Sequence, residues 1–324
     1  MHSPLLHYPL KDISNDNLRR LSDAVLQSYC FEGLANFDKE AALENERTDL
    51  WSLTDDDNPE SLQGVRERRG LGADVQDEEL MARVFELENG GLLLANVCRN
   101  DADETLIEVF STEVHDKTFF DNWAGYLKQF FYWANARYFV CWPRVGSEGA
   151  RQLSEIEGSY MADGFWAGAM KNIPLVQNHA LEFRPFSMAE DWEWYEREYQ
   201  AFLEQNPKFK YIVPISDEEE LEEACEEGLC DIALYKGEKL GMVMAESSAE
   251  LGFDGVMISD IFIASAFRGK GFASSLQRGF LASRNEQFAF VCGYIDARNP
   301  ASFSNARNQG RALLRQECYI PING

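Results

Sequence analysis

The segment DIFIASAFRGKGFASSLQRGF, residues 260–280, constrains the fold more than any other part of the chain. Its apolar strand pattern ends near Ile263, and a short loop with Gly269 and Gly271 follows. Apolar residues then recur every four positions, as on the buried face of a helix. Glycines allow consecutive backbone amides to line one concavity, and a helix N-terminus adds partial positive charge. This stretch therefore predicts a strand, a turn that can bind a pyrophosphate, and a helix.

The turn is basic although the chain is acidic. The 324 residues carry a formal net charge of −25, whereas residues 261–324 contain 8 Lys and Arg against 3 Asp and Glu. A local reversal of charge is typical of an anion-binding segment, and one short segment fits a small polyanion. The acidic remainder disfavours nucleic acids and fits amines, polyamines or basic peptides, although acidity can also serve solubility alone.

Other features exclude several classes of protein. The turn matches neither the GxxxxGK[ST] pattern of a P-loop nor the GxGxxG pattern of a dinucleotide-binding fold, so these two nucleotide-binding classes are excluded. There is no run of about 18 apolar residues, and the N-terminus lacks the pattern of a secretory signal. Seven cysteines without a CxxC pair indicate a reduced, cytoplasmic protein. The histidines lack the spacing of zinc ligands, so we expect no metal; they are His2, His7, His115 and His179.

Strand-like and helical patterns alternate irregularly along the chain, which predicts a mixed α+β fold. The segment CDIALYKGEKLGMVMAES predicts a hairpin, and the strands GVMISDIFIAS and FAFVCGYIDARN flank the helix that follows the glycine turn. The stretch near residues 170–185 predicts a passage between domains. The expected domains are residues 1–180 and residues 181–324.

The glycine segment also resembles the central motif of the GNAT superfamily of acyl-CoA-dependent N-acyltransferases. That motif is an acidic residue, an apolar strand end and R/Q-x-x-G-x-G/A, matched here by Arg268 to Ala273. A second segment, YIDARNPASFSNARNQGR, resembles the strand and the N-x-x-S/A helix that follow in this family. Asn299 and Ser302 have the motif spacing, and Gly310 falls where the family's helix ends. The resemblance covers roughly residues 181–324.

The resemblance implies a mixed, mostly antiparallel sheet flanked by helices, with acetyl-CoA as the cofactor. In GNAT proteins the amides of the glycine turn hold the pyrophosphate of coenzyme A, and the pantetheine arm lies between two central strands that splay apart. The residues that the resemblance assigns to coenzyme A are Phe262, Ile263, Arg268, Gly269, Lys270, Gly271, Phe272, Ala273, Asn299 and Ser302.

Acyl transfer to an amine needs a group that accepts the proton of the amine. No histidine follows His179, so a carboxylate or water must serve. Asp260, in the strand before the turn, is the first candidate, and Glu246, in the preceding strand, is the second. Asp260 can alternatively be a structural carboxylate that orients a loop. Direct attack is the usual family scheme, because a covalent acyl-Cys292 would need an activating partner.

The departing thiolate also needs a proton source. Many GNAT enzymes have a tyrosine seven residues after the motif asparagine, where this chain has Ala306. Tyr294 is the candidate replacement, with Tyr319 and Ser302 as alternatives, although Tyr294 also fits an ordinary strand aromatic. This departure leaves open direct release of the thiolate or an absence of catalysis.

An internal repeat is visible when EVFSTEVHDKTFFD, residues 108–121, is set against residues 260–273 without gaps. Glu108 then matches Asp260, Asp116 falls on Arg268, and both glycines of the turn are replaced. A carboxylate at this place opposes an anion. We therefore expect two GNAT-like domains in tandem, of which the first is degenerate and has no pyrophosphate loop. Chance similarity of one strand–helix unit is the alternative.

The sequence predicts an N-acetyltransferase that moves an acetyl group from acetyl-CoA to a primary amine by direct attack. The expected acceptor is a small cationic amine or a peptide amine, with neither nucleic acid nor membrane as a partner, and both a monomer and a homodimer stay open. The alternatives are a non-catalytic acyl-CoA-binding sensor or interaction module, and a structural protein whose turn binds nothing. A fold alone does not decide between them.

Overall fold

The computed structural model describes residues 3–32, 34, 38–72, 74–100, 102–175, 180–213 and 215–322. The chain forms two compact units that are interleaved in the sequence. The first unit comprises Met1–Cys30, Asp38–Ala162 and Arg315–Gly324, and the second comprises Phe31–Phe37 and Asp163–Leu314. The expected division into 1–180 and 181–324 stays a prediction about autonomous domains, since these compact units do not follow a single cut.

The first unit contains a mixed sheet whose strand order is β1-β2-β3-β4-β5-β12. Its pairings are antiparallel except that of β4 with β5, which is parallel. The elements, apart from short 3₁₀ turns, are β1 (Leu6–Pro9), α1 (Asn15–Gln27), α2 (Lys39–Ser52), α3 (Pro59–Arg69), α4 (Asp77–Leu80), β2 (Arg83–Glu86), β3 (Leu92–Arg99), β4 (Thr105–Ser111), α5 (Lys117–Phe130), β5 (Tyr138–Cys141) and α6 (Glu148–Ser154).

The second unit contains a sheet of the same kind, with the order β6-β11-β10-β9-β8-β7. Only β10 and β11 pair in parallel here. The elements, apart from short 3₁₀ turns, are β6 (Tyr160–Ala169), β7 (Glu182–Pro185), α7 (Met188–Gln205), α8 (Glu218–Glu226), β8 (Cys230–Tyr235), β9 (Glu238–Ser248), β10 (Gly255–Ile263), α9 (Phe272–Ala282), β11 (Phe290–Asp296) and α10 (Pro300–Asn308). β12 (Ala312–Pro321) begins in this unit and continues into the first.

The two halves of the chain repeat one order of elements and exchange their last strands. β6 follows the helices of the first half but pairs with β11, where Ala169 lies opposite Phe290. β12 follows the helices of the second half but pairs with β5, where Cys318 lies opposite Cys141. The repeated order and the mixed sheets confirm the predicted α+β fold class and are consistent with two tandem copies.

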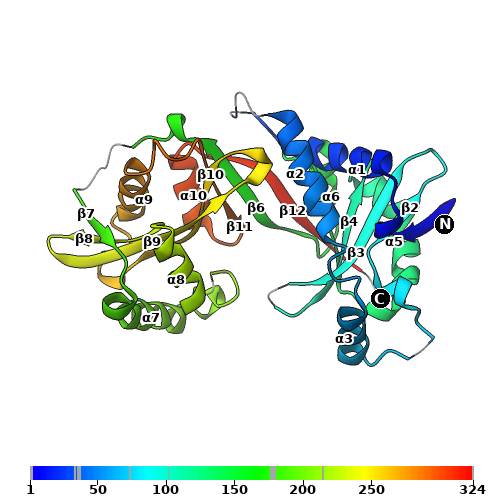
Figure 1. Ribbon diagram of the computed structural model, residues 1–324, viewed down its shortest axis with the longest axis horizontal. Coiled ribbons are helices and arrows are strands. Elements are labelled where there is room, and N and C mark those ends of the chain that lie inside the picture. Colours follow the sequence, from blue (N-terminus) through cyan, green and yellow to red (C-terminus); the bar gives the residue numbers. More distant parts are fainter. Residues whose placement is uncertain are drawn as a thin grey trace. The chain divides into compact units, whose positions relative to one another are not determined.

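The sheet of the second unit has a helix layer on each face (Figure 1). On one face, Leu276 and Phe280 of α9 pack against Val256 and Val291 of the two central strands. On the other face, the buried residues of α7 and α8 pack against β8, β9 and Phe262 of β10. Because both faces of the central strands are buried, their sequences are apolar along nearly their whole length. Among the described helices, none combines the length and apolarity that a membrane-spanning segment needs.

Candidate functional site

A cavity opens where the two parallel strands of the second unit separate. β10 pairs with β11 from Gly255↔Phe290 to Met257↔Cys292, and within the described residues the pairing stops there. The cavity has a volume of about 890 Å³ and is lined by both strands and by residues of α8, α9 and α10. The splayed strands that the sequence resemblance implies are therefore present.

The glycine turn lies at the wide end of this cavity. Gly269 and Gly271 have φ angles of 71° and 78°, in the left-handed region that favours glycine. A Cβ added at either position would meet nothing within 4 Å, so a ligand can approach the backbone closely. Gly271 is the N-cap of α9, and no described side chain caps this helix end. The turn thus offers an open helix N-terminus, a place that stabilises an anion.

Two cations flank the turn, and both are held by backbone carbonyls. Arg268 donates from Nε to the carbonyl of Ile263 over 2.7 Å, and its guanidinium lies 4.3 Å from the ring centre of Phe202. Lys270 donates from Nζ to the carbonyl of Ala266 over 2.7 Å. These contacts place positive charge beside the open end of α9, which favours a polyanionic ligand.

Asp260 lies on β10 at an irregularity in the strand. The register of β9 and β10 shifts between Ile258 and Asp260, so Ser259 is an extra, bulged residue. Asp260 is only partly exposed, lines the cavity, and accepts a 2.9 Å hydrogen bond at Oδ2 from the hydroxyl of Tyr195. Burial raises the pKa of the Asp260 carboxyl to about 7, against hydrogen bonds from Tyr195 and the backbone of Ile261 that lower it. A carboxyl with such a pKa can exchange a proton near neutral pH.

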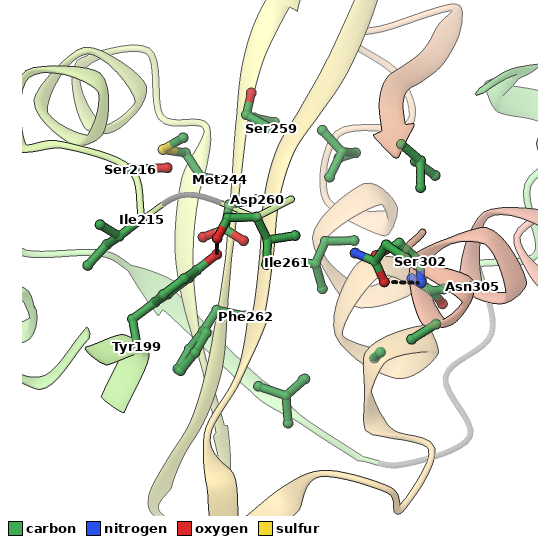
Figure 2. Close-up of a pocket in the computed structure, with 18 of the residues that line it drawn as sticks. Tyr199, Ile215, Ser216, Met244, Ser259, Asp260, Ile261, Phe262, Ser302 and Asn305 are labelled. Carbon is green, nitrogen blue, oxygen red and sulfur yellow. Dashed lines mark hydrogen bonds between the residues drawn. The ribbon is translucent and has the colours of Figure 1, made fainter. Parts of the chain in front are cut away.

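The side chain of Asp260 points to the α7–α8 face of the sheet (Figure 2). Tyr199 of α7 directs its hydroxyl toward it, and its ring stacks on Phe262 with the ring centres 4.9 Å apart. Ile261 points the other way, toward Ser302 and the helices of the opposite face. The cavity therefore reaches both faces through the gap between the strands, with the carboxyl on one side only.

The other predicted catalytic residues also line the cavity. Glu246 of β9 is exposed and accepts a 3.3 Å hydrogen bond at Oε1 from Ser259. Tyr294 of β11 is 54% exposed, and its ring centre lies 5.0 Å from that of Phe165. These roles stay predictions, but the structure does bring both side chains into one cavity with Asp260.

The residues assigned to coenzyme A cluster at the same cavity. Of the ten, Lys270 does not line it, and those that do are Phe262, Ile263, Arg268, Gly269, Gly271, Phe272, Ala273, Asn299 and Ser302. Asn299 is the N-cap of α10, where its Oδ1 accepts a 3.2 Å hydrogen bond from the amide of Ser302. Two segments far apart in the sequence thus meet at one open-ended cavity, as a single extended ligand would require.

Of the alternative acid and nucleophile candidates, Ser302 lines the cavity, whereas Tyr319 and Cys292 are less well placed. Ala306 is fully buried in a cluster with Trp166 and Phe303, away from the cavity lining. Tyr319 belongs to the first unit, where its ring stacks on that of Tyr160. Cys292 is buried, and burial raises the pKa of its thiol to about 12, which disfavours the reactive thiolate.

Several residues in or behind the cavity wall have no signal in the sequence. Tyr195 lies 65 positions before its hydrogen-bond partner Asp260, and only the fold brings them together. Arg311, directly after the helix-ending glycine, lines the inner part of the cavity. An acidic wall comes from α8 and the residues next to it, which supply Asp217, Glu220, Glu223 and Glu227. Charge is thus divided, with cations at the turn and carboxylates at α8.

The equivalent place in the first unit is closed. Asp116 caps α5, accepting a 2.8 Å hydrogen bond from the amide of Phe119, so a carboxylate occupies the end that is open in α9. β4 and β5 pair from Leu106↔Tyr138 to Glu108↔Val140, and beyond them Phe110 stacks on Trp142 with ring centres 4.7 Å apart. The guanidinium of Arg315 lies 4.6 Å from the ring centre of Trp142. Side chains of the unit therefore fill the region that forms the cavity in the second unit.

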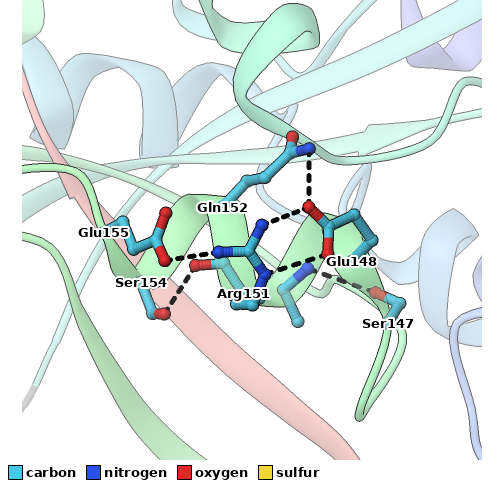
Figure 3. Close-up of polar contacts among 7 residues, drawn as sticks. Ser147, Glu148, Arg151, Gln152, Ser154 and Glu155 are labelled. Atoms are coloured by element: carbon cyan, nitrogen blue, oxygen red, sulfur yellow. Dashed lines mark hydrogen bonds and ion pairs between the residues drawn. The ribbon is translucent and has the colours of Figure 1, made fainter.

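The helix of the first unit that corresponds to α10 also presents different groups. α6 begins at the N-cap Ser147, whose Oγ accepts a hydrogen bond from the amide of Ala150 (Figure 3). Arg151 forms ion pairs with Glu148 and Glu155 one turn away on either side, and all three side chains are exposed. Such surface pairs contribute little to stability. The face of α6 that carries these ion pairs is exposed to solvent.

The structure offers no metal centre within the described residues. No group of three or more His, Cys, Asp or Glu side chains in those ranges could hold a metal ion. Two of the four histidines, His2 and His179, lie outside the described residues.

Comparison with solved structures identifies the fold. No family model and no curated protein matches the chain. The chain is similar to a GCN5-related N-acetyltransferase from Sphaerobacter thermophilus at 17% identity and a TM-score of 0.51, over 80% of this chain and 90% of that one. It also matches a GNAT-family acetyltransferase from Colwellia psychrerythraea at 11% identity, with a TM-score of 0.46 over 75% of this chain and 86% of that one. The first similarity shows that the chain has the fold of the GCN5-related N-acetyltransferases, or GNAT fold, and the predicted fold is confirmed.

Proposed function

We propose that this protein is an acyl-CoA-dependent N-acyltransferase that acts on a primary amine, with acetyl-CoA as the simplest donor. One observation carries the proposal: the open N-terminus of α9, the splayed strands and the Asp260 carboxyl all line one cavity. The glycine turn has space for a pyrophosphate, and beyond Met257↔Cys292 the described residues of β10 and β11 no longer pair with each other, which leaves a gap for an extended arm. The known activity of the Sphaerobacter relative's class supports the same reaction.

The proposed chemistry uses Asp260 as the general base. In its ionised form it accepts a proton from the amine as the nitrogen attacks the thioester carbonyl carbon. The N–C bond forms, the C–S bond breaks, and the leaving thiolate takes a proton from solvent. The hydroxyl of Tyr195 positions the carboxylate through its 2.9 Å hydrogen bond. The bulge at Ser259 aims Asp260 at the cavity rather than into a regular ladder.

The proposed acceptor is a cationic amine, either a small molecule or a peptide. Carboxylates of Glu220 and Glu223 on α8, of Glu227 directly after it and of Glu246 on β9 line the cavity on its acidic side. They attract a protonated amine to the mouth. The amine loses one proton to solvent before it attacks, and Asp260 accepts the second proton as the N–C bond forms. The basic turn repels the same cation, so donor and acceptor would enter from opposite sides.

Isothermal titration of acetyl-CoA tests the donor site first. We expect micromolar binding to the wild type and no binding to Arg268→Glu. Arg197→Glu, the same charge change on an exposed residue of α7, is the matched control and should bind as the wild type does. Release of free thiol across a panel of amines then tests transfer. Absence of binding to the wild type by acetyl-CoA and by other acyl-CoA donors would overturn the proposal.

A second candidate function is binding of an acyl-CoA without turnover, as in a sensor or an interaction module. The buried Ala306, at the place of the usual family tyrosine, favours it because an alanine has no hydroxyl that could protonate the leaving thiolate. This function predicts titration heat with acetyl-CoA but no thiol release with any amine. It also predicts that Asp260→Asn changes no measurable rate.

A further inference from the structure

Arg311 is a buried cation that forms no ion pair with any side chain in the described part of the chain. It is 5% exposed, and its Nη1 donates a long, 3.4 Å hydrogen bond to the carbonyl of Cys292. Within the described residues its Nε has no hydrogen-bond partner, and no carboxylate forms an ion pair with it. Arg284, the other buried arginine of this unit, shows the usual arrangement, with Asp231 2.8 Å away. A buried charge without a partner is costly, and a ligand anion would offset that cost.

The guanidinium of Arg311 lies at the narrow end of the cavity, where β10 and β11 begin to separate. A Cβ added at Gly293 would lie 3.3 Å from its Nη1 and 2.9 Å from the carbonyl of Ile258. Gly293 therefore allows the guanidinium to lie over β11 next to β10. The last strand pair, Met257↔Cys292, immediately precedes this point. Because Arg311 also lines the cavity, it forms the inner end of the space that begins at the glycine turn.

The side chains of Arg311 and Asp260 lie on opposite faces of the sheet. Gly293 shares a face with Val291, two residues before it, and Val291 packs in one cluster with Leu276 of α9. Arg311 is thus on the α9 side, which carries the glycine turn, whereas Asp260 contacts α7. An anion at Arg311 therefore belongs to the ligand that enters along α9, which is the acyl donor rather than the amine.

The direction of the donor determines which of its groups reaches Arg311. A coenzyme A thioester with its pyrophosphate at Gly269–Gly271 directs its pantetheine arm along the gap, and its acyl group is farthest from the turn. An acetyl group has no charge to offer at that end. An acyl group with a terminal carboxylate does, and arginine binds carboxylates with well-directed, charge-assisted hydrogen bonds.

We propose that Arg311 binds the terminal carboxylate of the donor's acyl group, so that the preferred donor is an ω-carboxyacyl thioester of coenzyme A, such as succinyl-CoA. This inference rests on the proposed function and changes only the acyl group. The carboxylate takes no part in the bond changes: the amine nitrogen bonds to the thioester carbon, the C–S bond breaks, Asp260 receives the amine proton and solvent protonates the thiolate.

The test compares two donors of equal chain length on the full-length protein. Succinyl-CoA and butyryl-CoA differ in that one carries a terminal carboxylate and the other a methyl group. We expect isothermal titration to show succinyl-CoA binding to the wild type at least about 10-fold more tightly, the usual effect of a hydrogen bond to a charged group. Equal affinity, or a preference for butyryl-CoA, would overturn the inference without any variant being needed.

Variants assign the preference to Arg311. In Arg311→Met the ratio of the two affinities should fall to about one or below, because the cation is gone. Arg311→Lys should keep part of the preference. Arg307→Met, on the exposed face of α10, is the matched control and should keep all of it. A succinyl preference that survives in a folded Arg311→Met would refute the role of this residue.

The same titrations separate failure of this inference from failure of the proposed function. If succinyl-CoA and butyryl-CoA bind equally well, the protein is an acyl-CoA protein without a carboxylate site. If no acyl-CoA binds at all, the proposed function falls as well. Thermal melting of each variant shows whether a lost preference reflects lost folding.

Discussion

The hydroxyl of Tyr195 donates a 2.9 Å hydrogen bond to Oδ2 of Asp260 and at the same time accepts one of 3.1 Å from the amide of Ser216. One phenol thus connects α7, the segment before α8 and the irregular strand β10. Burial raises the pKa of Tyr195 well above its usual value, so the phenol keeps its proton and remains a donor throughout the pH range in which Asp260 titrates. The carboxyl that we propose as the base is held by a donor that does not titrate.

Removing the carboxylate should abolish most of the transfer activity. Asp260→Asn should lower kcat by about 10²–10⁴-fold, the usual contribution of a general base. In the wild type, activity should rise with pH through about 7, because only the ionised carboxyl accepts a proton. A pH–rate profile measures this, and an unchanged profile in Asp260→Asn would refute the assignment.

The same substitution should stabilise the protein above neutral pH. The folded-state pKa of Asp260, about 7, lies above the ordinary value of 3.8, so the native state holds this proton more tightly than the unfolded state. Its contribution to stability is therefore full below the ordinary pKa and is lost as the pH rises toward about 7. The Tm of Asp260→Asn relative to that of the wild type should increase between about pH 5 and about pH 8. A Tm difference that is constant over this range would contradict the raised pKa.

Tyr195→Phe should move the pH–rate profile to higher pH. The hydroxyl of Tyr195 stabilises the ionised form of Asp260, so its removal raises the pKa of the carboxyl further. The pH at the midpoint of kcat/KM should rise. The maximal rate at high pH should fall less than the rate near the midpoint. Tyr132→Phe, at an exposed tyrosine of the first unit, should leave the midpoint where it is. A downward shift in Tyr195→Phe would show that the hydrogen bond has another role.

Gly271→Ala should weaken donor binding more than it weakens the fold. The residue has φ 78° and open space around a Cβ, so backbone strain of about 1–2 kcal/mol is the main cost. Relief of that strain turns the first amides of α9 away from the cavity. Gly228→Ala, with φ 70° and equally open space, carries the same strain outside the cavity and should lower Tm alike without changing acetyl-CoA affinity. Equal affinities in both variants would show that the turn does not hold the donor.

Asp116→Ala should destabilise the first unit without affecting acyl-CoA affinity. Loss of this N-cap removes a 2.8 Å hydrogen bond to the amide of Phe119 and should cost about 1 kcal/mol. Asp38→Ala, which removes the N-cap of α2, should cost a similar amount. Thermal melting and titration with acetyl-CoA measure the two effects. A change in the binding stoichiometry would show that the first unit also has a donor site.

The donor side of the site is predictable from sequence because its parts are local. A strand, two glycines and a helix occupy one short stretch, so the family resemblance alone assigns positions between Phe262 and Ala273 to the ligand, and most of those assigned line the cavity. The acceptor side is not local, because α7 and α8 precede β10 by many residues. Tyr195 occupies one of several aromatic positions on α7, and nothing in the sequence distinguishes it from Tyr199.

Other features depend on partners that sequence patterns do not identify. Arg311 follows a helix-ending glycine, where a charged residue is ordinarily exposed, and only the separation of β10 and β11 gives it a buried place. The exchange of β6 and β12 is equally hidden, since an apolar strand pattern does not tell which edge the strand joins. Asp116 was the basis for predicting a degenerate first copy, which stays a prediction, whereas the stacking of Phe110 on Trp142 had no signal in the sequence.

The exchanged strand β12 gives the chain a particular order of assembly during translation. The ribosome must synthesise residues 163–314 before it reaches Cys318–Pro321, the part of β12 that pairs with β5 in the first unit. Until then β5 has an unpaired edge, which is a place for misassociation of nascent chains. The first unit can complete its sheet only when the second has left the ribosome, so the half with the closed site matures last although it is made first. Expression of the two halves as separate chains would leave the first unit without β12 and the second unit without β6.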